Sequence, residues 1–177
     1  DKGINQGTSG NISVRVDEGF LITPSGVPYA EMVPEDIVLM DVEANSSGSR
    51  KPSTEWRFHR DIIQKKPEVG ATIHLHSMFC SSLSMLRREI PAVHYMIAAV
   101  GGPTVPCVPY ITWGTQELAD AIIGALNNRL ACLLANHGMV CVGPNLKKAA
   151  WLAVEGETAA GQYRRGAQGG APFLYIH

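Results

Sequence analysis

Ala71-Thr72-Ile73-His74-Leu75-His76-Ser77 is a run of apolar and β-branched residues that contains two histidines two positions apart. The run predicts a β-strand, and because side chains alternate between the faces of a strand, we expect His74 and His76 on the same face. Imidazoles placed side by side can offer two nitrogen ligands to one metal ion. Taken alone the pattern is weak, because a histidine in a strand is more often part of the core.

Two further residues have the chemistry to complete a metal site. His137 lies in Ala-Asn-His-Gly at 135–138, and Glu55 ends Pro-Ser-Thr-Glu at 52–55. Three histidines and a carboxylate suit Zn²⁺ or a similar divalent ion and leave coordination capacity for a substrate. The alternatives are structural: a hydrogen-bonded loop histidine, and a glutamate in the first turn of a helix. His59 has the spacing to join Glu55 on one helix face, but we interpret it as structural because three histidines already supply nitrogen.

The composition is that of one globular domain. The chain has 177 residues, of which 45% are apolar and 18% charged, and its net charge is −1. This balance fits a single domain with a substantial core. No cluster of Lys and Arg offers a surface for nucleic acid or an anionic membrane, and no apolar run is long enough for a transmembrane helix. The cysteines show no C-x-x-C spacing, so we expect reduced thiols in a cytoplasmic protein.

Strand and helix patterns are interleaved along the chain. Apolar and alternating runs predict strands over residues 11–16, 20–23, 37–42, 71–76 and 131–143, the last broken by a tight bend. Amphipathic patterns predict helices over residues 55–64, 78–88, 116–127 and 145–162. We expect Ser53 or Thr54 to cap the first helix and Trp151 to face the core from the last. Residues 105–109 contain two prolines, which places them at a sheet edge or in an extended loop. The fold class is therefore α/β, of an α+β-like kind, with one mixed sheet covered by helices.

Small and hydroxyl-bearing residues gather at three turns. They are Gly10, Asn11, Ser25, Gly26, Ser53 and Thr54. Hydroxyls, amides and backbone N–H groups of this kind bind phosphate without requiring lysine. Each turn alone is explained by ordinary turn or cap chemistry, but together they favour a small phosphate ester as the ligand.

The position of Glu55 suggests a reaction. It directly follows Ser53 and Thr54, so a phosphate bound there would bring nearby carbons within reach of the carboxylate and the metal. A metal that polarises a carbonyl, with a carboxylate to move the neighbouring C–H proton, is the equipment for enolate chemistry. Tyr95 is either a proton donor to an alkoxide or a core tyrosine, and its spacing does not decide between these roles.

Five motifs, in this order, resemble the class II aldolase/adducin family: Gly7-Thr8-Ser9-Gly10-Asn11, Thr23-Pro24-Ser25-Gly26, Ser53-Thr54-Glu55, His74-Leu75-His76 and Asn136-His137-Gly138. Within that family, residues 55–59 and 94–99 are most similar to members that act on L-fuculose 1-phosphate. The resemblance identifies residues 1–177 as the catalytic domain, and we expect the family's N-terminal helix and much of its C-terminal tail to lie outside this sequence. It implies a largely antiparallel sheet between helices and a cyclic homotetramer with active sites at subunit interfaces.

The activity that this resemblance implies is that of a Zn²⁺-dependent lyase. Such an enzyme splits a ketose 1-phosphate into dihydroxyacetone phosphate and an aldehyde such as L-lactaldehyde, through a zinc-stabilised enediolate. The zinc ligands would be His74, His76 and His137. Glu55 would be the acid/base and a further ligand when substrate is absent, and Tyr95 would exchange a proton with the aldehyde-side oxygen. The phosphate would be held by Asn11, Ser25, Gly26, Ser53 and Thr54, with Gly10 allowing close backbone approach.

Several alternatives stay open at this point. The same scaffold serves ribulose-phosphate 4-epimerases, a methylthioribulose-phosphate dehydratase, and aldolases for rhamnulose 1-phosphate or 5-deoxyribulose 1-phosphate. A non-catalytic, adducin-like interaction domain is an alternative of another class, but it has no need of three histidines and Glu55 together. A purely structural zinc site is disfavoured because such sites are usually closed and rich in cysteine.

Overall fold

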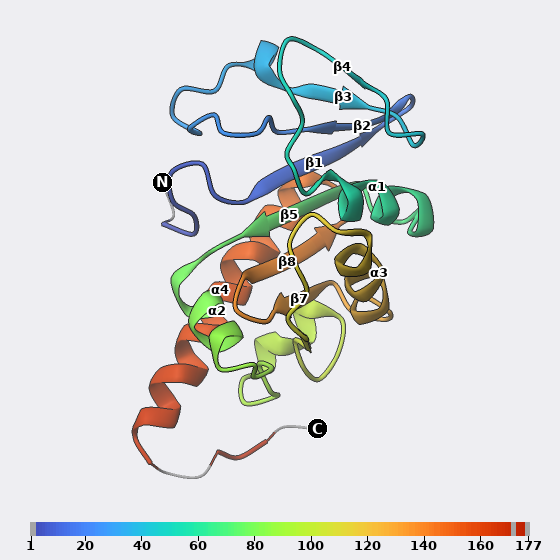
Figure 1. Ribbon diagram of the computed structural model, residues 1–177. Helices are drawn as coiled ribbons and strands as arrows, with labels where there is room; N and C mark the ends of the chain where they lie inside the picture. The colour runs from blue at the N-terminus through green and yellow to red at the C-terminus, as the bar shows by residue number, and fades with distance from the viewer. Residues whose placement is uncertain (1–2, 171–172, 176–177) are drawn as a thin grey trace.

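An eight-stranded sheet runs through the centre of the molecule (Figure 1). The computed structural model describes residues 3–170 and 173–175. The strands are β1 (Asn11–Val16), β2 (Gly19–Ile22), β3 (Val38–Met40), β4 (Ser46–Ser47), β5 (Ala71–Leu75), β6 (Cys107–Val108), β7 (Ala131–Leu134) and β8 (Gly138–Gly143). Their order is β4-β3-β2-β1-β5-β8-β7-β6, and neighbours are antiparallel except β6 and β7, which are parallel. The predicted mixed, largely antiparallel sheet is confirmed, and the proline-rich segment forms its edge strand β6.

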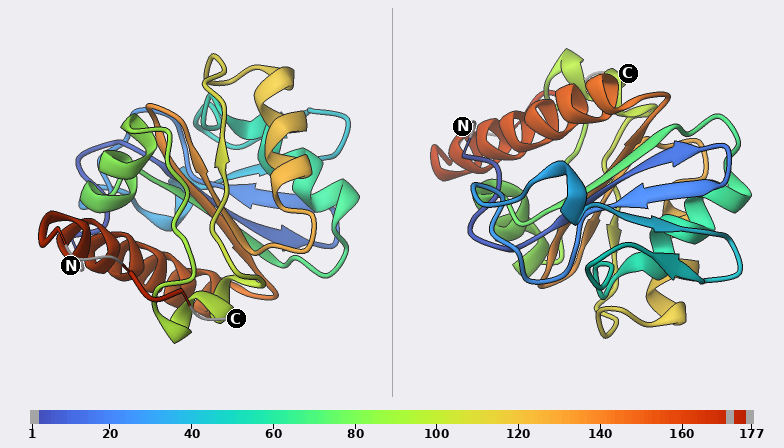
Figure 2. Two further views of the ribbon diagram at one scale, coloured as in Figure 1. Left: turned by 90° about the horizontal axis from the view of Figure 1, so that it is seen from below. Right: turned by 90° about the horizontal axis from the view of Figure 1, so that it is seen from above.

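Helices cover both faces of this sheet (Figure 2). They are α1 (Trp56–Lys65), α2 (Met78–Met85), α3 (Gln116–Ala125) and α4 (Leu146–Gln168), with two 3₁₀ helices, η1 (Pro34–Asp36) and η2 (Tyr95–Val100). The apolar residues of α2, α4 and η2 pack on one face, and those of α1 and α3 pack on the other. The sheet therefore separates the apolar core under α2 and α4 from the one under α1 and α3, as expected for a layered α/β domain. A third, smaller apolar cluster packs β2 and β3 against Ile63 of α1.

Strand β5 lies at the centre and divides its side chains between the two layers. Ala71, Ile73 and Leu75 are buried in the core formed with α2 and α4. The alternate residue His74 points to the opposite face, where its ring meets Phe58 of α1 edge-on with centroids 5.8 Å apart. The apolar residues of this strand thus build one core, while His74 is directed to the α1 side.

The register between β1 and β5 brings two distant segments together. Asn11 lies opposite His74, and Ser13 lies opposite Thr72. Residues directly opposite in antiparallel strands project to the same face, so Asn11 and Ser13 join His74 on the α1 side. The loop before β1 therefore lies beside the end of β5.

The start of α1 differs from the prediction. The helix begins at Trp56 with Glu55 as the cap residue, and no side chain makes a capping hydrogen bond there. Ser53, a predicted cap, lies in the preceding turn, where its hydroxyl accepts a hydrogen bond from the backbone N–H of Glu55 at 3.3 Å. The helix thus begins with the carboxylate of Glu55 at its N-terminus.

Helix α4 also differs from the prediction. It continues to Gln168, and Trp151 does not face the core but is 36% exposed. Ala149, Leu152 and Ala153 occupy the buried face instead, while the Lys148 ammonium lies 3.7 Å from the centroid of the Trp151 ring.

Among the described residues, no helix combines the length and apolar character needed to cross a bilayer.

Candidate active site

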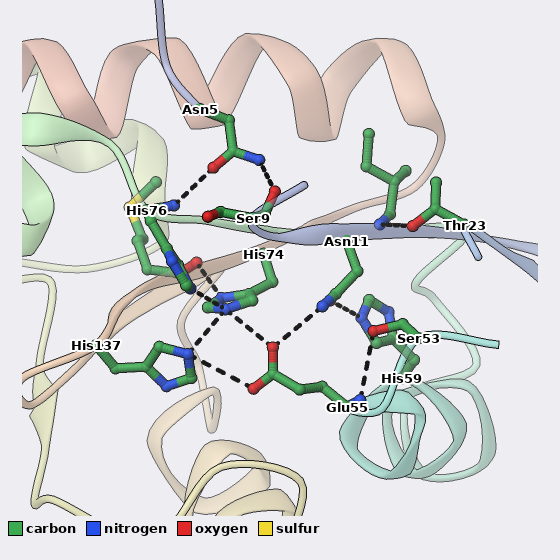
Figure 3. Close-up of polar contacts among 12 residues, drawn as sticks. Asn5, Ser9, Asn11, Thr23, Ser53, Glu55, His59, His74, His76 and His137 are labelled. Carbon is green, nitrogen blue, oxygen red and sulfur yellow. Dashed lines mark hydrogen bonds and ion pairs between the residues drawn. The ribbon is translucent and has the colours of Figure 1, made fainter. Parts of the chain in front are cut away.

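His74 and His76 bring their rings together where β5 ends (Figure 3). Nδ1 of His74 lies 3.0 Å from the carbonyl oxygen of Met139 in β8. A carbonyl only accepts, so Nδ1 carries the proton and Nε2 presents a lone pair to the site. Nε2 of His76 lies 2.9 Å from this nitrogen.

A tight turn between β7 and β8 supplies the third histidine. Asn136 adopts the left-handed conformation (φ 58°), which asparagine tolerates better than most residues. The backbone N–H of His137 donates to the carbonyl of Leu134 at 3.0 Å and closes the turn. A side chain at Gly138 would collide with the carbonyl oxygen at the end of β5, so glycine lets β8 approach that strand closely. The turn places Nε2 of His137 3.2 Å from Nε2 of His74.

Glu55 approaches the histidines from the start of α1 and is buried. Its Oε2 lies 3.2 Å from Nε2 of His74 and accepts a hydrogen bond from Nδ2 of Asn11 at 3.1 Å. Its Oε1 lies 3.6 Å from Nε2 of His137 and has no hydrogen-bond partner among the described residues. Because burying a carboxylate oxygen without a donor is costly, this atom indicates a position for a cation.

Burial and charge determine the protonation of these groups. Burial alone would raise the pKa of Glu55, but the neighbouring imidazoles of His74 and His137 and the hydrogen bond from Asn11 lower that pKa to about 2. Burial, together with the nearby His74, lowers the pKa of His76 and of His137 to about 4, against the opposing effect of Glu55. Near neutral pH the carboxylate is therefore ionised and both imidazoles are neutral, which are the forms that bind a metal ion.

The four side chains fit a divalent metal ion. Ligands about 2.1 Å from a tetrahedral zinc ion lie about 3.4 Å from one another. The ligand atoms here are separated by 2.9 to 3.6 Å where they contact one another. Within the part of the chain that the structure describes, His74, His76 and His137 form the one group of His, Cys, Asp or Glu with metal-binding spacing. The structure thus brings the predicted ligands together, and metal binding itself stays a prediction.

A pocket of about 350 Å³ opens beside the histidines, a volume within the usual range of small-molecule sites. All six residues predicted to bind phosphate line it: Gly10, Asn11, Ser25, Gly26, Ser53 and Thr54. Glu55, His76 and His137 line the same pocket. The predicted phosphate-binding residues therefore share one cavity with three of the four predicted metal ligands.

The loop before β1 is held against the end of β5. Gly10 has a φ of 72°, and a side chain at this position would collide with the carbonyl oxygen of His74. Asn5 ties the loop down from the other side: its amide donates to the carbonyl of Ser9, and its Oδ1 accepts from the backbone N–H of His76 at 3.1 Å. Asn5 was not identified from the sequence, because its contacts depend on the pairing of β1 with β5.

Two aromatic residues differ from the sequence-based expectations. Tyr95, predicted to act in catalysis, lies in η2 with its side chain 71% exposed and is not among the residues that line the pocket. Trp113, which was not predicted, does line the pocket. Its loop is held to α1 by a hydrogen bond from Arg57 to the carbonyl of Gly114 at 2.8 Å. No sequence spacing marks Trp113, because tertiary packing of this loop against α1 places it.

This chain is similar in sequence to known proteins. The family model described as Class II Aldolase and Adducin N-terminal domain matches residues 1–163. The L-fuculose phosphate aldolase of Escherichia coli strain K12 is 48% identical over 161 residues, which cover 91% of this chain and 75% of that protein. The 5-methylthioribulose-1-phosphate/5-deoxyribulose-1-phosphate aldolase of Rhodospirillum rubrum is 51% identical over 163 residues, which cover 92% of this chain and 74% of that protein.

The fold has a matching relative among solved structures. An L-fuculose 1-phosphate aldolase superposes with a TM-score of 0.93 at 38% sequence identity, and the match covers 98% of this chain and 82% of that chain. Sequence and fold therefore lead to the same group of proteins.

Proposed function

Because the chain belongs to the class II aldolase and adducin family, we propose that it is a metal-dependent aldolase. Its substrate is L-fuculose 1-phosphate or a similar ketose 1-phosphate. The products are dihydroxyacetone phosphate and an aldehyde such as L-lactaldehyde. The observation that carries this proposal is the place of Glu55, which contacts the histidine cluster and lines the pocket with the predicted phosphate-binding residues. A ketose held there by its phosphate has its reacting carbons close to a carboxylate and to the metal ligands.

We assign one divalent ion per subunit, Zn²⁺, to His74, His76 and His137, with Glu55 as a further ligand when no substrate is bound. Imidazole nitrogens and a carboxylate are the donors typical of catalytic zinc, which keeps a position open for substrate. When bound, such an ion supplies the Lewis acidity that stabilises negative charge on the carbonyl oxygen of the ketose.

Glu55 transfers the proton at carbon. When the bond between C3 and C4 of the ketose breaks, its electron pair moves toward the carbonyl group, and C3 must then gain a proton. In the synthetic direction the same carbon loses that proton. The Glu55 carboxylate is ionised in the resting site because its pKa is lowered to about 2, so it is able to accept the proton from C3 in synthesis. In cleavage it first takes up a proton from solvent and then delivers that proton to C3.

The phosphate is held by the polar wall of the pocket. Asn11, Ser25, Ser53 and Thr54 contribute an amide and hydroxyl groups, and Gly10 and Gly26 contribute backbone that a ligand can approach closely. These donors need no lysine, which agrees with the absence of lysine from the pocket wall among the described residues.

Tyr95 is assigned to the active site of a neighbouring subunit in a cyclic homotetramer. Its side chain is largely exposed and lies outside the pocket of its own chain, so a second copy is able to receive it. There the tyrosine hydroxyl would take the proton of the C4 hydroxyl while passing its own proton to solvent as the aldehyde forms. A contact of this kind joins two different surfaces, and such interfaces close into rings when the rotation between subunits permits.

A cytoplasmic location is part of the same proposal. All four cysteines are free, and Cys80, Cys132 and Cys141 are buried. Thiols without disulfides are typical of proteins in a reducing compartment.

The similarity to the Rhodospirillum rubrum enzyme supports a second candidate, an aldolase for 5-deoxyribulose 1-phosphate or 5-methylthioribulose 1-phosphate. The identities of 48% and 51% do not separate the two candidates. Cleavage of any ketose 1-phosphate between C3 and C4 leaves the phosphate on the three-carbon product, so dihydroxyacetone phosphate is formed in both cases. The resemblance of residues 94–99 to enzymes that act on L-fuculose 1-phosphate favours the first candidate.

A substrate panel tests the proposal. The zinc-loaded protein is assayed for dihydroxyacetone phosphate released from L-fuculose 1-phosphate, L-rhamnulose 1-phosphate, 5-deoxyribulose 1-phosphate and 5-methylthioribulose 1-phosphate. The proposal expects the highest kcat/KM for L-fuculose 1-phosphate, and a higher value for either ribulose derivative selects the second candidate. Epimerisation of ribulose 5-phosphate or dehydration of methylthioribulose 1-phosphate, without aldol cleavage, would overturn the aldolase assignment. No turnover of any of these compounds would favour an adducin-like interaction domain.

A further inference from the structure

His59 lies on α1 one helical turn after Glu55 and is completely buried. Its Nδ1 is 2.7 Å from the hydroxyl of Ser13, and its Nε2 is 2.6 Å from Oδ1 of Asn11. The amide nitrogen of Asn11 continues the series to Oε2 of Glu55 at 3.1 Å (Figure 3). Ser13 and Asn11 are 1% and 3% exposed, so no solvent competes for these hydrogen bonds.

The direction of every hydrogen bond in this series follows from the charge of Glu55. A carboxylate only accepts, so the amide nitrogen of Asn11 must face it and the amide oxygen must face His59. That oxygen also only accepts, so Nε2 of His59 carries the proton. Burial lowers the pKa of His59 to about 3, so the ring is neutral and its bare Nδ1 accepts from the hydroxyl of Ser13.

The orientation of the Asn11 amide has a consequence for the pocket that it lines. With its oxygen held by His59, Asn11 has only N–H groups to present to Glu55 and to a ligand. In the flipped orientation the amide oxygen would face the carboxylate of Glu55, and an acceptor would replace a donor where the phosphate is proposed to bind. We propose that His59 is a positioning residue that fixes the Asn11 amide as a donor toward both Glu55 and the substrate phosphate. The phosphate part of this inference rests on the proposed function.

A purely structural role for His59 makes a different prediction. Its ring stacks on Phe58 with centroids 4.3 Å apart, and any side chain that fills this space would serve packing alone. The positioning role instead requires an N–H group at the place of Nε2. Glutamine and asparagine separate the two requirements, because the glutamine side-chain nitrogen reaches about the place of Nε2 and the asparagine nitrogen reaches about the place of Nδ1.

The test compares the wild type with H59Q and H59N, each loaded with zinc. The dissociation constant of inorganic phosphate is measured by calorimetry, and KM and kcat are measured with the best substrate of the panel. H59Q is expected to stay within about threefold of the wild type, and H59N to weaken phosphate binding and raise KM about tenfold, the effect of losing one buried hydrogen bond. Zinc affinity is expected to be equal in all three proteins, because His59 is not a ligand.

Several outcomes would overturn the inference. Equal phosphate affinity in H59Q and H59N would reduce His59 to a packing residue, and weakened zinc binding in H59N would place the effect at the metal instead. If H59N does not fold, H59M replaces it: methionine fills the space without an N–H group at the place of Nε2, so phosphate binding should again weaken, and unchanged binding would contradict the positioning role. Phosphate binding that follows this pattern in a protein without aldolase activity would support the inference while rejecting the proposed function.

Discussion

Oε1 of Glu55 lies 3.6 Å from Nε2 of His137 and accepts no hydrogen bond from any described residue. The other oxygen of the same carboxylate is held by Asn11 and contacts His74. One oxygen is therefore anchored, while the other faces the cluster of imidazole nitrogens. This asymmetry suits a carboxylate that contacts a metal ion in the resting site and moves a proton during the reaction.

Replacing Glu55 with glutamine (E55Q) keeps the shape of the side chain and removes the base. We expect kcat to fall about 10²- to 10⁴-fold, because proton transfer by a positioned side chain contributes about that much. The three histidines should still retain zinc. Steady-state release of dihydroxyacetone phosphate, together with metal analysis of the purified protein, measures both effects.

H137A is the comparison, since it removes a nitrogen ligand and should lose zinc as well as activity. An E55Q variant with wild-type kcat would show that another group moves the proton.

Mixing two inactive variants tests whether Tyr95 acts in the site of a neighbour. E55Q and Y95F are each expected to be nearly inactive alone. Hybrids assembled from equal amounts contain sites with both wild-type side chains, and random assembly of a ring predicts about one quarter of the wild-type activity. The measurement is the rate of dihydroxyacetone phosphate release after the subunits are unfolded and refolded together. If both residues belonged to one subunit, the mixture would stay as inactive as its components.

The histidine cluster and the residues that line the pocket were predictable because their signals are local. Alternation in a strand places His74 and His76 on one face whatever surrounds them, and the Asn-His-Gly turn has the composition of a tight bend. The position of Tyr95 was not predictable in this way, because packing of η2 against the α4 layer determines which of its side chains are exposed. The positions of Trp113 and Asn5 depend on contacts between segments that are distant in the sequence. Trp151 shows that small residues can occupy the buried face of a helix, here α4, while its largest side chain lies at the margin of that face.

Glu157 of α4 supports the segment that follows His76. Its Oε2 accepts from the hydroxyl of Ser77 at 2.6 Å and from the backbone N–H of Cys80 at 2.9 Å, and its Oε1 accepts from the backbone N–H of Phe79 at 2.8 Å. These bonds hold the N-terminus of α2.

The substitution E157Q places an amide N–H₂ against one of these donors. We expect it to lower the free energy of unfolding by about 1–3 kcal/mol, as for other buried hydrogen bonds that lose a partner. Zinc affinity should also fall, because His76 directly precedes the segment. The matched control is E155Q on the same helix, whose side chain makes no hydrogen bond to the described residues and whose effect should stay within about 0.5 kcal/mol. Urea unfolding and zinc titration measure the two quantities, and equal values for E157Q and E155Q would count against this role.

The buried, neutral His59 predicts acid sensitivity. Burial lowers its pKa to about 3 in the folded protein, whereas a histidine in the unfolded chain has a pKa of about 6.5. Between these values the unfolded state binds a proton that the folded state does not bind. The free energy of unfolding therefore falls as the pH falls through this range, by about 1.4 kcal/mol per pH unit for this residue. Urea unfolding of the metal-free wild type and of H59Q at about pH 6 and about pH 5 should show a smaller loss in H59Q. Identical losses would mean that His59 is not kept neutral by the fold.

In the proposed mechanism, aldol cleavage requires a metal ion held by His74, His76 and His137. The most direct measurement is the release of dihydroxyacetone phosphate from the best ketose 1-phosphate of the panel, before chelation, after complete metal removal, and after zinc is added back. Release should disappear with the metal and return with zinc. Turnover that is unchanged after complete metal removal would contradict this mechanism.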